Sequence, residues 1–128
     1  VTPVIIVDMH AEATSEKVAM GWFLDGKVSC VFGTHTHIPT ADERILPKGT
    51  AFITDVGMTG PYDSVIGRRV DQILERFLSS MPHKSEVAED NIQLRGLLVE
   101  IHPATGKATA IQRLTKTLER AVRGASGD

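Results

Sequence analysis

The amino-acid sequence predicts an α/β fold, in which short buried strands alternate with helices. Continuous apolar, β-branched runs at residues 4–7, 27–32 and 50–54 are typical of strands that are buried on both faces. Stretches with apolar residues at helical spacing follow the first and the third of these runs. Because strands separated by helices usually belong to one largely parallel sheet, this order predicts an α/β architecture.

The first helix is expected to begin at Thr14 or Ser15, because either hydroxyl can accept a hydrogen bond from a free backbone N–H group. Gly26 is well placed to end it, since glycine readily takes the left-handed conformation that follows many helices. The apolar stripe of this helix is expected to contain Val18, Ala19, Trp22 and Phe23.

The second half of the chain predicts a longer helix, a loop and a hairpin. Apolar residues recur at helical spacing over residues 65–78, with charged and amide side chains between them. Residues 79–91 are polar and predict a surface loop. Residues 93–102 and 107–114 then predict a β-hairpin across a Pro-Ala-Thr-Gly turn.

The composition narrows the class of protein. The chain has 128 residues, 41% hydrophobic and 23% charged, which fits one globular domain. Its formal net charge of −2 argues against a general nucleic-acid or membrane-surface binder, which normally carries a basic face. No segment approaches the roughly 18 apolar residues that a membrane span needs, so no membrane partner is expected. Cys30, the one cysteine, is expected to be a buried hydrophobe in a protein of the reducing cytoplasm.

Polar and ionisable residues follow each of the three predicted strands. His10 comes after the first strand, His35 and His37 after the second, and Asp55 after the third. In α/β sheets the ligand crevice lies outside the carboxyl ends of the strands. If the three strands are parallel neighbours, these four side chains should therefore converge on one edge of the sheet.

Three histidines with nearby carboxylates suit a transition metal such as manganese, iron or zinc. Asp8 and Glu12 could orient the imidazole rings from outside the metal's own ligands. Thr34 and Thr36 could bind phosphate, or merely their own loop backbone. The residues by themselves leave a structural alternative open, because histidines after strands often have no ligand and Asp8 and Asp55 could simply cap loops.

Three motifs carry a resemblance to a known family. They are D-x-H-A-E-A-T-S-E-K from Asp8, G-T-H-T-H from Gly33 and T-D-V-G-M-T-G-P from Thr54. Together they closely resemble the YmdB-like family of bacterial metallophosphoesterases, which are relatives of the calcineurin-like phosphoesterases. The likeness covers most of Pro3 to Gly67, and the predicted hairpin also fits. Chance agreement across all three motifs is not plausible.

The resemblance implies a β-sandwich flanked by helices, with two metal ions, usually iron or manganese, at one edge of the strands. It implies hydrolysis of phosphodiesters, including 2',3'-cyclic nucleotides. By carry-over, His10 and His35 bind one metal ion and His37 binds the other. A hydroxide bridging two metal ions about 3.5–4 Å apart would attack phosphorus, while the metal ions stabilise charge on the phosphoryl oxygens.

The sequence also departs from the family pattern. The remaining ligands are an aspartate after the family's first strand, a Glu-Asn pair and an Asn-His whose histidine acts on the leaving group, and none of these motifs occurs here. Asp8 belongs to the D-x-H-A-E motif and is not that aspartate. Residues 1–128 are therefore expected to be the C-terminal portion of a single metallophosphoesterase domain, about half of it, with no catalytic histidine.

Three hypotheses follow from this departure. The chain is part of a phosphodiesterase whose other half is missing from it, disordered or supplied separately. Alternatively, it is a non-catalytic metal-binding fragment, or a structural or partner-binding domain whose histidines cap loops. The three intact motifs speak against the last. Half a sandwich would leave an open sheet edge and an exposed apolar face, which predict pairing with the missing N-terminal half or with another copy as a homo-oligomer.

Overall fold

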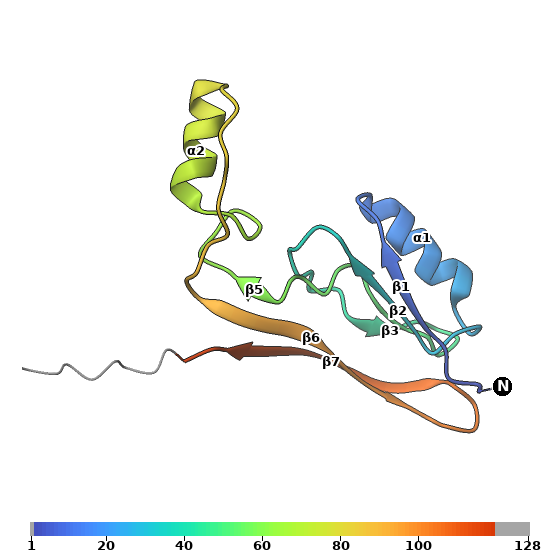
Figure 1. The fold of residues 1–128 in the computed structure, drawn as a ribbon. Helices are drawn as coiled ribbons and strands as arrows, with labels where there is room; N and C mark the ends of the chain where they lie inside the picture. Colours follow the sequence, from blue (N-terminus) through green and yellow to red (C-terminus); the bar gives the residue numbers. More distant parts are fainter. Residues whose placement is uncertain (1, 120–128) are drawn as a thin grey trace, which may run out of the picture.

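The computed structural model describes residues 2–119, which form two β-sheets and two helices (Figure 1). The elements in chain order are β1 (Ile6–His10), α1 (Thr14–Leu24), β2 (Cys30–Thr34), β3 (Arg44–Ile45), β4 (Ala51–Ile53), β5 (Gly60–Pro61), α2 (Val70–Ser79), β6 (Ile92–Ile101) and β7 (Ala108–Thr117). The predicted α/β class is therefore confirmed.

The first sheet has the strand order β1-β2-β4-β3, in which β1, β2 and β4 run parallel and β3 is antiparallel. Its register places Ile6 opposite Cys30 and His10 opposite Thr34. The three predicted strands are thus parallel neighbours, and their carboxyl ends meet at one edge of the sheet. β1 is the end strand, so one of its two backbone edges carries no further strand among residues 2–119.

The first strand differs from the prediction in its position and in its burial. It continues through Asp8 to His10. Side chains alternate between the two faces of a strand, and Asp8 lies on the exposed face, so its charge does not end the strand. Val7 and Met9 pack toward α1 on the other face, whereas Ile6 is 53% exposed. The expectation of a strand buried on both faces is wrong for β1, since one face of this end strand is uncovered. It is right for β4, which is buried throughout.

Helix α1 has the predicted position but not the predicted start. Thr14 is the first residue inside the helix, and Ala13 occupies the N-cap position. Since a capping side chain must come from the residue before the first helical one, no hydroxyl caps this helix.

The face that α1 packs against the sheet is centred on Gly21. A Cβ atom there would lie 2.5 Å from the Phe52 ring, so only glycine lets the helix come this close. Trp22 and Phe23, expected in the buried stripe, are instead 49% and 67% exposed. The Lys27 ammonium lies 4.2 Å from the centre of the Phe23 ring, a contact that partly compensates for this exposure.

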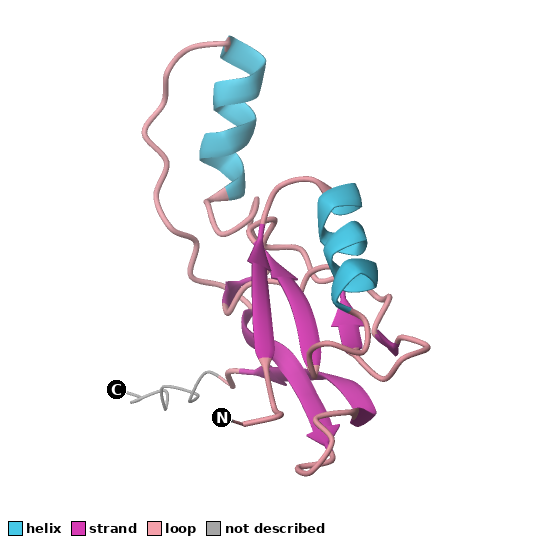
Figure 2. Cartoon of the chain, turned by 90° about the vertical axis from the view of Figure 1, so that its right-hand side faces the viewer, coloured by secondary structure: helices cyan, strands magenta, loops and turns pink. Residues whose placement is uncertain are grey.

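Apolar cores lie on both faces of the first sheet, which α1 covers on one side (Figure 2). The buried residues of the core beneath α1 are Val31, Leu46 and Phe52. On the opposite face, Cys30 and Ala51 pack against Ala108 of β7. Burial raises the pKa of the Cys30 thiol to about 11, which keeps this side chain a neutral, buried hydrophobe as predicted.

The second sheet has the order β5-β6-β7 and is antiparallel, and its strands β6 and β7 form the predicted hairpin (Figure 1). Helix α2 projects away from both sheets and begins at Val70 instead of Val65. The later start has a local cause, because Ile66 and Gly67 have positive φ angles in a turn that pairs Val65 with Arg68. Neither α1 nor α2, the helices of the described residues, is long and apolar enough to cross a membrane.

Gly33 of β2 lies where the backbone of Thr54 leaves no room for a side chain. A Cβ atom at Gly33 would lie 1.6 Å from the Thr54 carbonyl oxygen. We therefore expect Gly33→Ala to lower the free energy of unfolding by about 3 kcal/mol or more, as measured by urea unfolding. Gly96→Ala in β6 is the matched control, because its added Cβ atom would meet nothing within 4 Å. Equal unfolding midpoints for the two variants would contradict this packing.

Candidate functional site

The candidate site lies at the carboxyl ends of β1 and β2. Asp8 and His10 point to the same face of β1, away from α1, because they alternate with Val7 and Met9. Thr34, the last residue of β2, lies opposite His10 in the parallel register. The strands thus place a carboxylate, a hydroxyl and an imidazole side by side.

The hydrogen bonds of Thr34 determine which nitrogen of His10 carries a proton. The Thr34 hydroxyl donates its only hydrogen to Asp8 Oδ1, 2.7 Å away. The 2.9 Å hydrogen bond between Thr34 Oγ1 and His10 Nδ1 must therefore be donated by the imidazole. In the neutral ring this assignment leaves a lone pair on His10 Nε2.

His35 presents a second lone pair to the same point. Its Nε2 lies 2.7 Å from Glu12 Oε2, and a carboxylate only accepts, so Nε2 carries the proton of the neutral ring. The remaining nitrogen, Nδ1, lies 3.1 Å from His10 Nε2. Two lone pairs at this distance repel each other unless a cation, either a proton or a metal ion, lies between them.

The spacing of these nitrogens fits a shared metal ion. Two nitrogen ligands that each lie about 2.1 Å from one ion are about 3.0–3.4 Å apart at octahedral and tetrahedral angles. The Asp8–Thr34 pair also holds the His10 ring from behind, as the outer partners of metal-binding histidines do. His35 is 44% exposed and Glu12 84% exposed, so the pair of rings is open to solvent.

His37 lies apart from this pair. Its Nδ1 donates to the carbonyl oxygen of Ile66 at 3.0 Å, which leaves a lone pair on Nε2 of the neutral ring. Over the described part of the chain, no group of three or more His, Cys, Asp or Glu side chains is arranged to hold a metal ion. The structure therefore brings together His10 and His35, and joins His37 to neither of them.

The loop that carries both of these later histidines is strained. His35 and His37 have φ angles of 101° and 68°, and each such residue costs roughly 1–3 kcal/mol unless it is glycine. Thr36 between them is held at two points, since its N–H and its hydroxyl both donate to Asp55 Oδ2, at 3.2 and 2.7 Å. Both threonines expected near the site therefore bond to protein carboxylates, Thr34 to Asp8 and Thr36 to Asp55.

Asp55 is buried below this loop and does not join the histidines at the edge. It is 1% exposed, accepts a hydrogen bond from Gly57 N at 2.8 Å, and lies 2.8 Å from Lys17 Nζ. Burial alone would raise the pKa of Asp55, but the hydrogen bonds from its neighbours outweigh burial and hold that pKa below its ordinary value. The sequence left open whether Asp55 joins the histidines or caps a loop, and its hydrogen bonds from Thr36 N and Gly57 N show that it caps a loop.

Lys17 is the residue of this site that the sequence did not reveal. It is 1% exposed, and its ammonium forms an ion pair with Asp55. Lys17 is the last residue of the D-x-H-A-E-A-T-S-E-K motif, and it lies four residues before Gly21 on the face of α1 that contacts the sheet, but neither signal identifies its partner. From sequence alone, a lysine is expected to be exposed to solvent unless an acidic partner for it is known.

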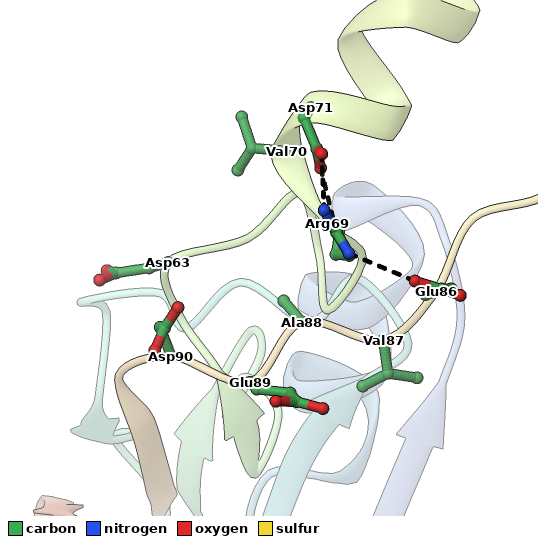
Figure 3. Close-up of a pocket in the computed structure, with 9 residues that line it drawn as sticks. All are labelled: Asp63, Arg69, Val70, Asp71, Glu86, Val87, Ala88, Glu89 and Asp90. Carbon is green, nitrogen blue, oxygen red and sulfur yellow. Dashed lines mark hydrogen bonds and ion pairs between the residues drawn. The ribbon is translucent and has the colours of Figure 1, made fainter.

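A large cavity lies elsewhere, at the base of α2 (Figure 3). It has a volume of about 660 Å³ and is lined by Asp63, Arg69, Val70, Asp71, Glu86, Val87, Ala88, Glu89 and Asp90. Arg69 spans part of it, with ion pairs to Asp71 at 2.7 Å and Glu86 at 3.4 Å. None of the site residues predicted from the sequence lines this cavity.

A second hollow lies between the two sheets and is mainly apolar. Its volume is about 390 Å³. It is lined by Ile6, Cys30, Phe32, Val56, Gly96, Leu97, Val99 and Ile101. We call it the intersheet groove. It borders β1, the strand with the open edge.

Comparisons with known proteins agree with the resemblance that the motifs carry. The model of the YmdB-like protein family matches residues 1–114. A 2',3'-cyclic-nucleotide 2'-phosphodiesterase of Bacillus subtilis (strain 168) is 55% identical over 113 residues, which are 88% of this chain and 43% of that protein. A putative phosphatase/phosphodiesterase of Mycoplasma pneumoniae is 50% identical over 103 residues, which are 80% of this chain and 37% of that protein.

Two solved structures share the fold. A hypothetical protein from Thermus thermophilus is 43% identical with a TM-score of 0.83, over 90% of this chain and 45% of that one. A novel phosphatase from Mycoplasma pneumoniae is 44% identical with a TM-score of 0.85, over 90% of this chain and 41% of that one. The chain thus spans less than half the length of each relative. With its family match over residues 1–114, the chain belongs to the YmdB-like protein family.

Proposed function

We propose that this chain is part of a metal-dependent phosphodiesterase that acts on phosphodiesters such as 2',3'-cyclic nucleotides. The observation that carries the proposal is the pair of facing lone pairs on His10 and His35, 3.1 Å apart. The names of the Bacillus and Mycoplasma relatives support the reaction class. A cytoplasmic setting fits a chain whose one cysteine, Cys30, is a buried thiol.

In this proposal His10 and His35 hold one metal ion and His37 holds a second, with iron or manganese favoured and zinc as a further candidate. When bound, such a pair of ions supplies an activated water and stabilises charge on the phosphoryl oxygens. The chain's own contribution is orientation. Asp8 and Thr34 fix the His10 ring, and the Ile66 carbonyl fixes the His37 ring, so that each presents Nε2.

We further propose that residues outside these 128 complete the site. Three imidazoles bring no negative charge to offset two metal ions, and the nearby Asp55 is committed to Lys17. The candidates are the missing N-terminal half and another copy of this chain. The open edge of β1 and the apolar intersheet groove are the surfaces that either would cover.

The runner-up is a non-catalytic metal-binding fragment. The same lone-pair argument favours it equally, because it concerns metal binding and not turnover. A domain whose histidines only cap loops is less favoured, since capping does not require two imidazole nitrogens to face each other at 3.1 Å.

Metal content tests the ligand assignment. We expect natively purified chain to carry about one equivalent of iron, manganese or zinc by elemental analysis, and the double variant His35→Ala/His37→Ala to lose it. The matched control is His83→Ala/His102→Ala, which removes two exposed histidines outside the site. Equal metal content in all three proteins would show that His35 and His37 are not metal ligands.

Turnover tests whether the site is complete. We expect the chain alone to hydrolyse bis(4-nitrophenyl) phosphate at a rate close to that of His35→Ala, because it lacks the carboxylate and the leaving-group histidine of the family. The rates would be compared by absorbance with added manganese. Ready turnover that His35→Ala abolishes would show that these 128 residues form a complete enzyme.

The oligomeric state tests the uncovered surface. We expect sedimentation equilibrium to give a mass above the 13.9 kDa of one chain, because self-association covers the intersheet groove. Ile6→Glu, which places a charge in the groove, should shift the protein toward the monomer. Leu98→Glu is the control, since Leu98 alternates with the groove residues of β6 and is 52% exposed. A monomeric wild-type chain, or dissociation by both variants alike, would contradict this use of the groove.

A further inference from the structure

We infer that Lys17 and Asp55 are positioning residues, which hold the loop of His35 and His37 in its ligand-presenting conformation through Thr36. The inference rests on the proposed function, because the conformation of this loop matters for binding only if its histidines are ligands. Neither residue is proposed to touch a metal ion or a substrate.

The Asp55 carboxylate forms a buried junction between segments of the chain. Its Oδ2 receives the Lys17 ammonium at 2.8 Å and both donors of Thr36, at 3.2 and 2.7 Å. Its Oδ1 receives Gly57 N at 2.8 Å. These contacts come from α1, from the loop after β2 and from the segment after β4. One buried carboxylate therefore joins three parts of the chain.

Stability alone explains this junction poorly. Lys17 and Asp55 are each 1% exposed, and taking two charges out of water costs about as much as their attraction returns. An apolar pair of similar size would often stabilise a fold as well or better. A buried pair is better suited to specify one arrangement of the groups that hydrogen-bond to it, and here that group is Thr36.

The backbone is strained on either side of Thr36. His35 and His37 both have φ angles in the left-handed region, which persists in non-glycine residues only when the surroundings enforce it. The two hydrogen bonds of Thr36 supply that enforcement at the residue between them. The Lys17 ammonium in turn keeps Oδ2 of Asp55 ionised and fixed as their acceptor.

The two histidines that face each other belong to different segments of the chain. His10 belongs to the segment that continues through Glu12 into α1 and Lys17, while His35 belongs to the loop after β2. The buried contacts of Asp55 with Lys17 and Thr36 join these two segments, and the exposed contact between Glu12 and His35 joins them again at the surface. Loss of the buried contacts should let the loop relax and the nitrogens of His10 and His35 separate.

The test compares two threonines. Thr36→Val removes a hydroxyl that donates to Asp55, and Thr54→Val removes a buried hydroxyl that donates to Asp42. Cobalt(II), a spectroscopic stand-in for the native metal, is titrated into each 128-residue chain. We expect Thr36→Val and Lys17→Met to weaken cobalt binding roughly 10- to 100-fold and to alter its visible absorption bands. Thr54→Val should leave both unchanged, and Thr36→Ser should restore them.

A metal-free readout keeps the inference separate from the proposed function. In long-range proton–nitrogen NMR spectra, the rings of His35 and His37 should each show one tautomer in the wild type and in Thr54→Val. They should average between tautomers in Thr36→Val and Lys17→Met. Unchanged ring signals in those two variants would overturn the positioning role. Cobalt binding that His35→Ala/His37→Ala leaves intact would instead overturn the ligand assignment, whatever the NMR spectra show.

Discussion

Parallel pairing of β1 with β2 is the constraint on which the candidate site depends. The register sets Thr34 opposite His10, so that one hydroxyl bridges Asp8 and His10 and determines which ring nitrogen keeps its proton. The next residue, His35, then faces the His10 ring across 3.1 Å. Neither histidine could present its lone pair there alone, because each belongs to a different strand end and only the pairing of the strands joins them.

Charge is distributed so that the support of the site is buried and its histidine pair is open to solvent. Lys17 and Asp55 neutralise each other below the loop, where each is 1% exposed. The Glu12 partner of His35 is 84% exposed, and a polar contact so open to water contributes little to stability. Glu12 can therefore exchange its contact at small cost, whereas the buried pair cannot. The rigid part of the site is the part that does not contact the metal ion in our proposal.

The first sheet is left partly uncovered on the face that carries the histidine pair. α1 covers one face of the first sheet, while the second sheet covers only part of the other, because β7 packs beneath β3 and β4 and the face of β1 stays exposed. The intersheet groove, the edge of β1 and the histidine pair all lie on this uncovered side. A polypeptide that covered the groove would also be well placed to reach the His10 and His35 rings.

The sequence by itself determined what depends on local pattern: the α/β class, the three parallel-sheet strands, the hairpin, and the placement of His10, His35 and His37 after strand ends. Tertiary structure alone decided which face of α1 is buried, because the close packing of Gly21 depends on Phe52 of a different element. It also decided the role of Lys17, whose partner Asp55 is 38 residues away. A buried charge is tolerated only opposite its counter-charge, and no local pattern records a partner that the fold supplies.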